Sequence, residues 1–311
     1  MPKALPKRFT DEEAARAHLE AIQWPEGPIC PHCGVIDRAS RIAGGRKGLM
    51  FCNACRMQFS VTVGTVFERS KLPLNTWLYA THLLCSSKKG ISSQQLARML
   101  GVTVKTAWFM SHRIREAMAP LPGLEPPLGG DGFIVESDET EIAPSRKSRP
   151  RKRAKNLKFA TLVERDGRVR SKKLTGAKGS MAAEIHSALR NNVDAASTLH
   201  TDGAQMYKAA WPVDQRESVD HNKEFVRETE AGEKVHVNTA EGYFSIFKRG
   251  LVGTYQHMSE QHLHRYLAEF DHRMSYRVKL GYTDDMRTDK ALEGIVGKRL
   301  MYGCPNETAH A

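Results

Sequence analysis

The sequence predicts an α/β catalytic domain with a mixed sheet, preceded by a small ribbon of paired cysteines and a helix-turn-helix. Three observations carry this prediction. After residue 130, predicted strands come first and are followed by a strand that alternates with helices, which is typical of a sheet covered by helices. Cysteines occur in two close pairs within residues 30–55. Residues 75–118 have a helical pattern with breaks at 88–90 and at Gly101.

Composition limits the class of protein. The chain has 311 residues, of which 40% are hydrophobic, so it can form two or three domains with a buried core. The formal net charge of +12 favours a polyanionic partner such as nucleic acid. No apolar run reaches the roughly 18 residues that cross a membrane, and the N-terminus lacks the apolar core of a secretion signal. We therefore expect a cytoplasmic protein with reduced cysteines and no membrane partner.

Composition shifts divide the chain into five segments, and a run rich in proline and glycine marks the clearest boundary. The predicted segments are an N-terminal helix with the cysteine ribbon (1–66), a helix-turn-helix region (67–121), a linker (122–130), the catalytic domain (131–277) and a C-terminal tail (278–311).

The first predicted element is a short helix. Thr10 and Glu13 occupy the positions of a capping box, so the helix should begin there and continue to about Ile22. Pro25 and Gly27 then end it.

The two cysteine pairs that follow, Cys30 with Cys33 and Cys52 with Cys55, are separated by 18 residues. Two thiolates two residues apart can hold one face of a tetrahedral zinc ion, and a second pair completes the shell. We predict a structural Zn²⁺ site in a ribbon of short strands and turns. Redox-active or free thiols are the alternative.

Residues 91–116 have the pattern of a helix-turn-helix. The small Ala97 suits a helix crossing, Gly101 suits the turn, and Val102 and Val104 are expected to pack inward. A serine, Ser92 or Ser93, is the expected cap of the first helix. The second helix is expected to meet DNA through Thr103, Lys105, Thr106, Trp108, His112 and Arg113. An ordinary helical hairpin is the alternative.

The catalytic half is predicted from alternating patterns of strands and helices. Asp166-Gly167 is a strong hairpin signal between two apolar runs. The expected strands are 133–138, 158–163, 169–174 and 196–202, and the expected helices are 181–190, 239–249 and 259–274.

A basic run at residues 145–158 contains no acid. We expect a loop between the first two strands of the catalytic domain that contacts phosphates without reading the base sequence. A solvated loop is the alternative. The residues expected to bind DNA there are Arg146, Lys147, Arg151, Lys152 and Arg153.

Acids lie at the ends of two predicted strands, Asp138 and Asp202. Carboxylates from distant parts of a chain can converge on two metal ions that promote phosphodiester chemistry, although a strand-end aspartate is commonly only a turn residue. Around the first strand end the pattern leaves the choice open among four acids: Glu136, Asp138, Glu139 and Glu141.

A third acid, Glu241, lies on the predicted helix 239–249 seven residues before Lys248. Seven residues are close to two helical turns, so both side chains project from one face, about 10 Å apart along the axis. We expect the acid to help hold a divalent cation, and Lys248 and Arg249 to meet the DNA backbone.

Several motifs together resemble a known family. They lie at residues 24–33, 64–74, 107–116, 135–140, 236–250 and 253–257. On these motifs the chain resembles the DDE transposases of bacterial insertion sequences, in the branch with an N-terminal zinc ribbon and an RNase H-like, ISXO2-like transposase domain. The resemblance extends from about residue 9 to residue 277.

The resemblance implies that Asp138 and Asp202 are the first two metal ligands, with Mg²⁺ or Mn²⁺ as the cofactor. The third is a glutamate or an asparagine in this branch, and both Glu241 and Asn238 are present. We choose Glu241 because a carboxylate binds a hard cation better than an amide does, and we assign Asn238 as a helix cap or neutral residue of the metal shell. The chain departs from the family pattern after Glu141 and at Gln256, and neither change affects an acid.

The function that the resemblance implies is transposition. The protein would bind the terminal repeats of an insertion sequence in double-stranded DNA, cleave a strand, and join the freed 3′-hydroxyl to target DNA. Two DNA ends must meet, so we expect a homo-oligomer on DNA. The alternatives are a catalytically silent DNA-binding regulator and a nuclease without strand transfer.

Overall fold

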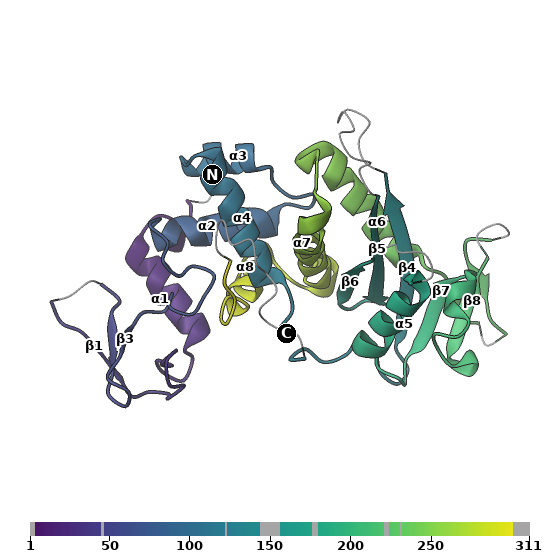
Figure 1. Ribbon diagram of the computed structural model, residues 1–311, viewed down its shortest axis with the longest axis horizontal. Coiled ribbons are helices and arrows are strands. Elements are labelled where there is room, and N and C mark those ends of the chain that lie inside the picture. Colours follow the sequence, from purple (N-terminus) through teal and green to yellow (C-terminus); the bar gives the residue numbers. More distant parts are fainter. Residues whose placement is uncertain are drawn as a thin grey trace. The chain divides into compact units, whose positions relative to one another are not determined.

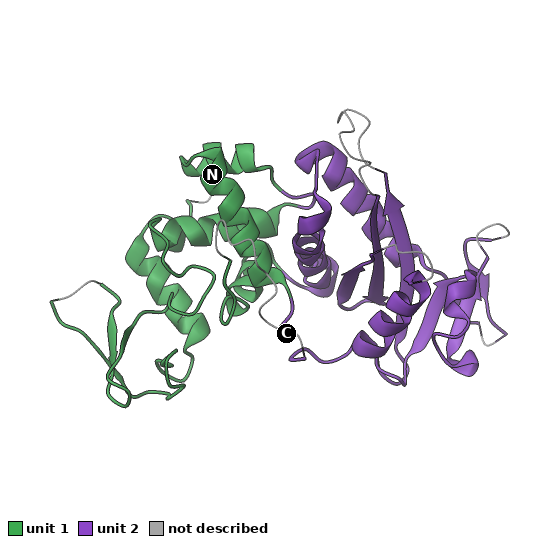
Figure 2. Ribbon diagram, viewed as in Figure 1, with its two compact units in different colours: residues 1–87, 91–119, 283–311 green, residues 88–90, 120–282 purple. Residues whose placement is uncertain are grey.

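The computed structural model describes residues 4–44, 47–121, 123–143, 156–175, 180–220, 224–230 and 232–300. The chain forms two compact units (Figure 2). Unit 1 contains Met1–Ser87, Ile91–Ala119 and Thr283–Ala311, and unit 2 contains Lys88–Gly90 and Pro120–Tyr282.

Unit 1 contains a small antiparallel sheet in the order β1-β2-β3, which lies in the cysteine ribbon after the first helix. Its strands are β1 (Ala39–Arg41), β2 (Met50–Cys52) and β3 (Gln58–Phe59). Met50 and Phe59 are buried beside the cysteines in a cluster of only a few side chains. Such a small core needs an additional cross-link, which a metal ion can supply.

The helices of unit 1 share one hydrophobic core, which includes Leu19, Leu78, Leu96 and Ile114. They are η1 (Lys7–Phe9), α1 (Glu12–Gln23), α2 (Leu74–Ser86), α3 (Ser93–Leu100), α4 (Val104–Met118) and α8 (Asp284–Glu293). Figure 1 shows α8, in yellow, among helices from the N-terminal part of the chain.

The cap of α1 differs from the prediction. Asp11 is the N-cap, and its Oδ2 accepts hydrogen bonds from the backbone N–H groups of Glu13 at 3.1 Å and Ala14 at 3.4 Å. The predicted capping box with Thr10 is therefore wrong. Asp11 lies one residue closer to the helix, where its carboxylate reaches those N–H groups and favours the positive end of the helix dipole.

The helical pair α3–α4 has the predicted break. Gly101 ends α3 with a φ of 67°, a left-handed conformation that glycine adopts without strain. Ser92 is the N-cap of α3 and accepts from the N–H of Gln95 at 3.2 Å. Val102 is half-buried against the core, but Val104 is 50% exposed, so its predicted inward packing is wrong. Val104 is the first residue of α4, where no preceding turn covers the side chain.

The segment expected to be a tail contributes α8 to unit 1. It packs against α1, α2 and α4. Ala291, Leu292 and Ile295 are fully or almost fully buried in the shared core. The backbone of Ile295 also accepts a hydrogen bond from the N–H of Val66 at 3.1 Å.

Unit 2 is built on a sheet in the order β6-β5-β4-β7-β8. β4 pairs antiparallel with β5 and parallel with β7, and β7 pairs parallel with β8, so the predicted mixed sheet is confirmed. The hairpin predicted at Asp166-Gly167 joins β5 to β6. The strands are β4 (Ile134–Ile142), β5 (Leu157–Glu164), β6 (Val169–Lys173), β7 (Thr198–Asp202) and β8 (Arg216–Val219), with a separate pair β9 (Arg227–Glu228) and β10 (Lys234–Val235).

Helices cover both faces of this sheet (Figure 1). Alternate residues of β5 face opposite ways: Phe159 and Val163 pack against α6 (Asn238–Gly250) and α7 (Leu263–Ser275), whereas Leu162 packs against α5 (Met181–Asn192). Short helical turns complete the unit: η2 (Gln205–Tyr207), η3 (Val213–Gln215), the π-helix η4 (Leu251–Tyr255), η5 (Glu260–His262) and η6 (Val278–Leu280).

Within the described segments, none of the helices combines the length and the apolar character that crossing a membrane requires.

Candidate functional site

Asp138 and Asp202 lie on neighbouring parallel strands. Asp202 is the last residue of β7, but β4 continues to Ile142, so the prediction that Asp138 ends its strand is wrong. β4 and β7 pair with Ser137 opposite Thr201, so Asp138 and Asp202 are next in register and on the same face of the sheet. Ligands of α/β sheets commonly bind beyond the carboxyl end of a parallel strand, which here is the end of β7. The backbone N–H of Glu139 donates to Oδ1 of Asp138 at 2.8 Å, which fixes that carboxylate.

The third predicted acid reaches the same region from α6. Glu241 lies in the first turn of the helix and Lys248 in its last turn. A pocket of about 510 Å³ lies between β4 and α6, and it is lined by Asp138, Glu139, Thr140, Glu241, Phe244, Ser245, Lys248 and Arg249. The Lys248 ammonium lies 6.0 Å from the centre of the Phe244 ring. The pocket thus combines acids at one end of α6 with two cations at the other.

The neighbouring acids are close enough to Asp138 to affect its ionisation. Burial, followed by the charge of Glu139 and the smaller effects of Asp202 and Glu241, raises the pKa of Asp138 from 3.8 to about 7. A divalent cation would offset this repulsion, and carboxylate oxygens are the ligands that Mg²⁺ and Mn²⁺ prefer. The donor set therefore fits such a cation.

The other acids of β4 have different surroundings. Glu136 is fully buried and points into the start of α6, where it accepts backbone hydrogen bonds. Glu139 accepts a hydrogen bond of 2.6 Å from the Tyr207 hydroxyl, and burial raises its pKa. Glu141 is exposed and forms an ion pair of 2.9 Å with Lys158. These contacts narrow the choice that the sequence left open to Asp138 and Glu139, which both line the pocket. We retain Asp138, because the Glu139 carboxylate already accepts the hydrogen bond from Tyr207.

Asn238 is the first residue of α6 and its side chain is exposed. The N-cap is Val237, and no side chain of the cap residue bonds to the helix. The prediction that Asn238 caps the helix is therefore wrong. The first N–H groups of α6 are instead satisfied from β4 by Glu136.

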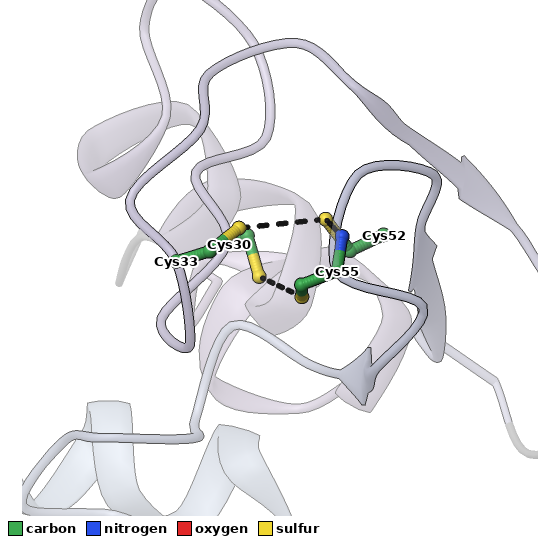
Figure 3. Close-up of side chains that lie close together, drawn as sticks. All are labelled: Cys30, Cys33, Cys52 and Cys55. Atoms are coloured by element: carbon green, nitrogen blue, oxygen red, sulfur yellow. Dashed lines mark hydrogen bonds between the residues drawn. The ribbon is translucent and has the colours of Figure 1, made fainter.

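The four ribbon cysteines form one cluster (Figure 3). Their sulfur atoms all lie within 4.8 Å of one another, with 3.6 Å from Cys30 to Cys55 and 3.7 Å from Cys33 to Cys52. Sulfurs bound to one tetrahedral zinc at about 2.3 Å are about 3.8 Å apart, so the cluster fits Zn²⁺. The backbone N–H groups of Cys55 and Ala54 lower the pKa of Cys52 to about 6, whereas burial and the neighbouring cysteines raise the pKa of Cys55 to about 12, so the zinc assignment rests on the geometry.

The residues of α4 that were expected to contact DNA differ in how exposed they are. Lys105 is exposed and Thr106 is half-buried, both in the first turn. Trp108 is half-buried, and its ring packs against His112. Arg113 is buried, donates to the carbonyl of Glu68 at 2.7 Å and stacks on Trp77. Arg113 therefore holds the core of unit 1 together, and we leave it out of the proposed DNA surface.

The remaining cations expected to bind DNA fall into two groups. Lys248 and Arg249 are exposed at the pocket beside α6. The other group lies outside the described residues: Arg146, Lys147, Arg151, Lys152 and Arg153.

Two residues of the site carried no sequence signal. Arg165 lies in the β5–β6 hairpin and contacts Glu136, and Tyr207 contacts Glu139. Each is distant in sequence from its partner, so only the fold brings them together. The position of Glu136 could have been expected in part, since it lies two residues before Asp138 and thus on the same face of the strand.

Comparison with known proteins assigns the class. Residues 127–275 match the ISXO2-like transposase domain, and residues 10–58 match the transposase zinc-ribbon domain. The chain therefore belongs to the zinc-ribbon-bearing transposases with an ISXO2-like domain, as its motifs predicted. It is also similar to a protein of Halobacterium salinarum (strain ATCC 700922 / JCM 11081 / NRC-1) described as "Uncharacterized protein in transposable element ISH50". The two are 29% identical over 282 residues, which cover 86% of this chain and 92% of the relative.

Proposed function

We propose that this transposase binds the ends of an insertion sequence and catalyses metal-dependent DNA strand cleavage followed by strand transfer. The observation that carries the proposal is the convergence of Asp138, Asp202 and Glu241 from two parallel strands and a helix. After burial, the charges of Glu139, Asp202 and Glu241 each raise the pKa of Asp138, so several carboxylates lie close to it. A cluster of this kind is suited to a divalent cation.

The residues have separate roles in this proposal. Asp138, Asp202 and Glu241 would hold Mg²⁺ or Mn²⁺, which would activate the attacking oxygen and stabilise the leaving oxygen of the phosphodiester. Lys248 and Arg249, at the other end of the pocket, would bind phosphates of the strand being cut. Their position two turns from the acids would set the strand across the pocket.

DNA binding away from the pocket would come from unit 1. The zinc ribbon and the α3–α4 pair would contact the element ends, with Lys105 and Thr106 at the exposed start of α4. Both ends of an element are joined to one target, so we propose that the chain acts as a homo-oligomer on DNA.

The proposal is tested with purified zinc-loaded protein, labelled duplexes from the DNA that flanks its gene, and Mg²⁺ or Mn²⁺. Wild-type protein should release a 3′-hydroxyl end and join it to target DNA, whereas Asp138→Asn should do neither. Glu141→Gln is the matched control, because Glu141 is an acid of the same strand that is exposed and paired with Lys158. It should retain cleavage.

Each other outcome rejects part of the proposal. Specific binding without cleavage by wild-type protein would indicate a DNA-binding regulator. Cleavage without a joined product would indicate a nuclease. Normal cleavage by Asp138→Asn would show that the site lies elsewhere.

A further inference from the structure

We infer that Glu136 and Arg165 form a positioning pair that fixes the start of α6, and through it the place of Glu241 relative to Asp138. The expected effect on the metal site rests on the proposed function. The role of the pair at the start of α6 does not depend on DNA cleavage. Neither residue lines the pocket among the described residues, so both would act through α6.

The start of α6 depends on Glu136. A helix begins with N–H groups that lack partners within the helix, and a side chain of the cap residue usually satisfies them. Here the cap residue Val237 provides no acceptor. Instead, Oε2 of Glu136 accepts from the N–H of Thr239 at 2.8 Å and of Ala240 at 3.2 Å, and Oε1 accepts from the Thr239 hydroxyl at 2.9 Å. The carboxylate also lies at the positive end of the helix dipole.

Arg165 allows this carboxylate to be buried. Glu136 is 0% exposed, and a buried charge is costly unless it is paired and hydrogen-bonded. Both Nε and an Nη of Arg165 donate to Oε1 of Glu136 at 3.2 Å. The guanidinium also donates to the carbonyl oxygens of Lys234 at 3.2 Å and His236 at 3.3 Å, which lie just before α6. Arg165 therefore binds both Glu136 and the backbone just before α6.

A neutral histidine completes the surroundings of Arg165. The guanidinium lies 3.2 Å from Nδ1 of His200 on β7. Burial, followed by the charge of Arg165, lowers the pKa of His200 to about 4, so the neutral ring accepts this hydrogen bond. His236 is close to both charged groups, and burial followed by the charge of Arg165 lowers its pKa as well. The two rings therefore add no positive charge beside Arg165 near neutral pH.

The arrangement links two of the proposed metal ligands. Glu136 precedes Asp138 by two residues on the same face of β4. Glu241 directly follows Ala240, whose N–H is held by Glu136. One strand therefore carries the first acid and also anchors the helix that carries the third. Loosening this anchor would change the separation of the acids without removing any of them.

The test compares Glu136→Gln with the control Leu189→Ala in the zinc-loaded full chain, without Mg²⁺ or Mn²⁺. Glutamine keeps the size of the side chain but replaces one of the two oxygens by an amide donor and removes the negative charge, so the N–H groups of α6 lose the charged acceptor and Arg165 loses its carboxylate. Leu189 is fully buried on the opposite face of the sheet, so its truncation lowers stability without touching α6.

Hydrogen exchange of the peptide that begins α6 is the decisive readout. Loss of a hydrogen bond to a charged group corresponds to about a tenfold or larger increase in the exchange rate. We expect this increase at Thr239 and Ala240 in Glu136→Gln and no such increase in Leu189→Ala. Unchanged exchange in Glu136→Gln would overturn the inference. Should that variant not fold, Thr239→Val removes one of the three contacts, and an increase of about threefold at Ala240 is then expected. Wild-type exchange in Thr239→Val would likewise overturn it.

The consequence for the site is tested by the Mn²⁺ concentration that gives half-maximal cleavage. Glu136→Gln should raise it by about tenfold, the lower end of the effect of residues that orient metal ligands, and Leu189→Ala should leave it unchanged. Faster exchange with an unchanged Mn²⁺ requirement would show that Glu136 holds the helix without positioning Glu241. Absence of cleavage by wild-type protein would reject the proposed function. The exchange measurement would still show whether Glu136 holds the start of α6.

Discussion

Asp138→Asn is predicted to stabilise the folded protein at pH 8 while abolishing cleavage. In the folded chain, burial and the neighbouring carboxylates raise the pKa of Asp138 from 3.8 to about 7. The folded state therefore prefers the protonated carboxyl, and ionisation at high pH weakens it. Asparagine resembles the protonated form, and its Oδ1 can still accept the backbone hydrogen bond that Glu139 donates at 2.8 Å.

The magnitude follows from the pKa difference. A rise from 3.8 to about 7 is about three units, and at about 1.4 kcal/mol for each unit the ionised carboxylate costs at most about 4 kcal/mol. Partial solvent screening lowers the expected gain to about 2–4 kcal/mol. Below pH 4 the carboxyl is protonated in both the folded and unfolded states, so the variant gains nothing. The gain grows as pH rises from about 4 to 7 and is complete above 7.

Urea denaturation between pH 5 and pH 8 measures this gain, in buffer that retains zinc and contains no Mg²⁺ or Mn²⁺. Adding Mn²⁺ should then stabilise the wild-type protein and leave Asp138→Asn unchanged, because a ligand stabilises only the state that binds it. Glu141→Gln is the control, and its stability should change in the opposite direction. Hydrogen bonds from Asn156 and Lys158 lower the pKa of Glu141, so the folded state favours its ionised form. An Asp138→Asn variant that is no more stable than wild type at pH 8, or whose gain does not depend on pH, would refute the reasoning.

Three further predictions concern other parts of the chain. Glu241→Gln should abolish cleavage while Asn238→Ala, at an exposed position, should reduce it less; the reverse order in a cleavage assay would make Asn238 the third ligand. Tyr243→Phe should lower the free energy of unfolding by about 1–3 kcal/mol, because the buried Asp271 loses a hydrogen bond of 2.6 Å; unchanged urea denaturation would contradict this. Cys52→Ser should lower the bound zinc measured by metal analysis and the thermal stability of unit 1, whereas full zinc content would reject the four-cysteine site.

The sequence predicted those features that local pattern determines. The two CxxC pairs, the hairpin at Asp166-Gly167 and the break at Gly101 all depend on residues close together in the chain. The sequence also predicted that Asp138 and Asp202 can converge, but the structure brings them together through the parallel pairing of β4 with β7 and not through two strand ends.

Features that depend on tertiary contacts were missed. The cap of α6 could not be predicted because its acceptor, Glu136, lies about a hundred residues earlier in the chain. Arg113 is a charged residue on a predicted reading helix, yet it stacks on Trp77 in the core. The docking of α8 in unit 1 likewise depends on a complementary surface made by helices from the other end of the chain. None of these contacts can be inferred from the residues next to them in the sequence.

The central claim is that acids from separate elements form one metal-dependent site that cuts DNA, and Asp202→Asn tests it most directly. Asp202 comes from a different strand than Asp138 and is joined to it only by the parallel pairing of β4 and β7. The measurement is release of a labelled 3′-hydroxyl end from the element-end duplex in Mn²⁺, with binding to the same duplex measured in parallel. The account predicts that Asp202→Asn binds the duplex as wild type does and releases no product. Release of product at the wild-type rate would contradict it.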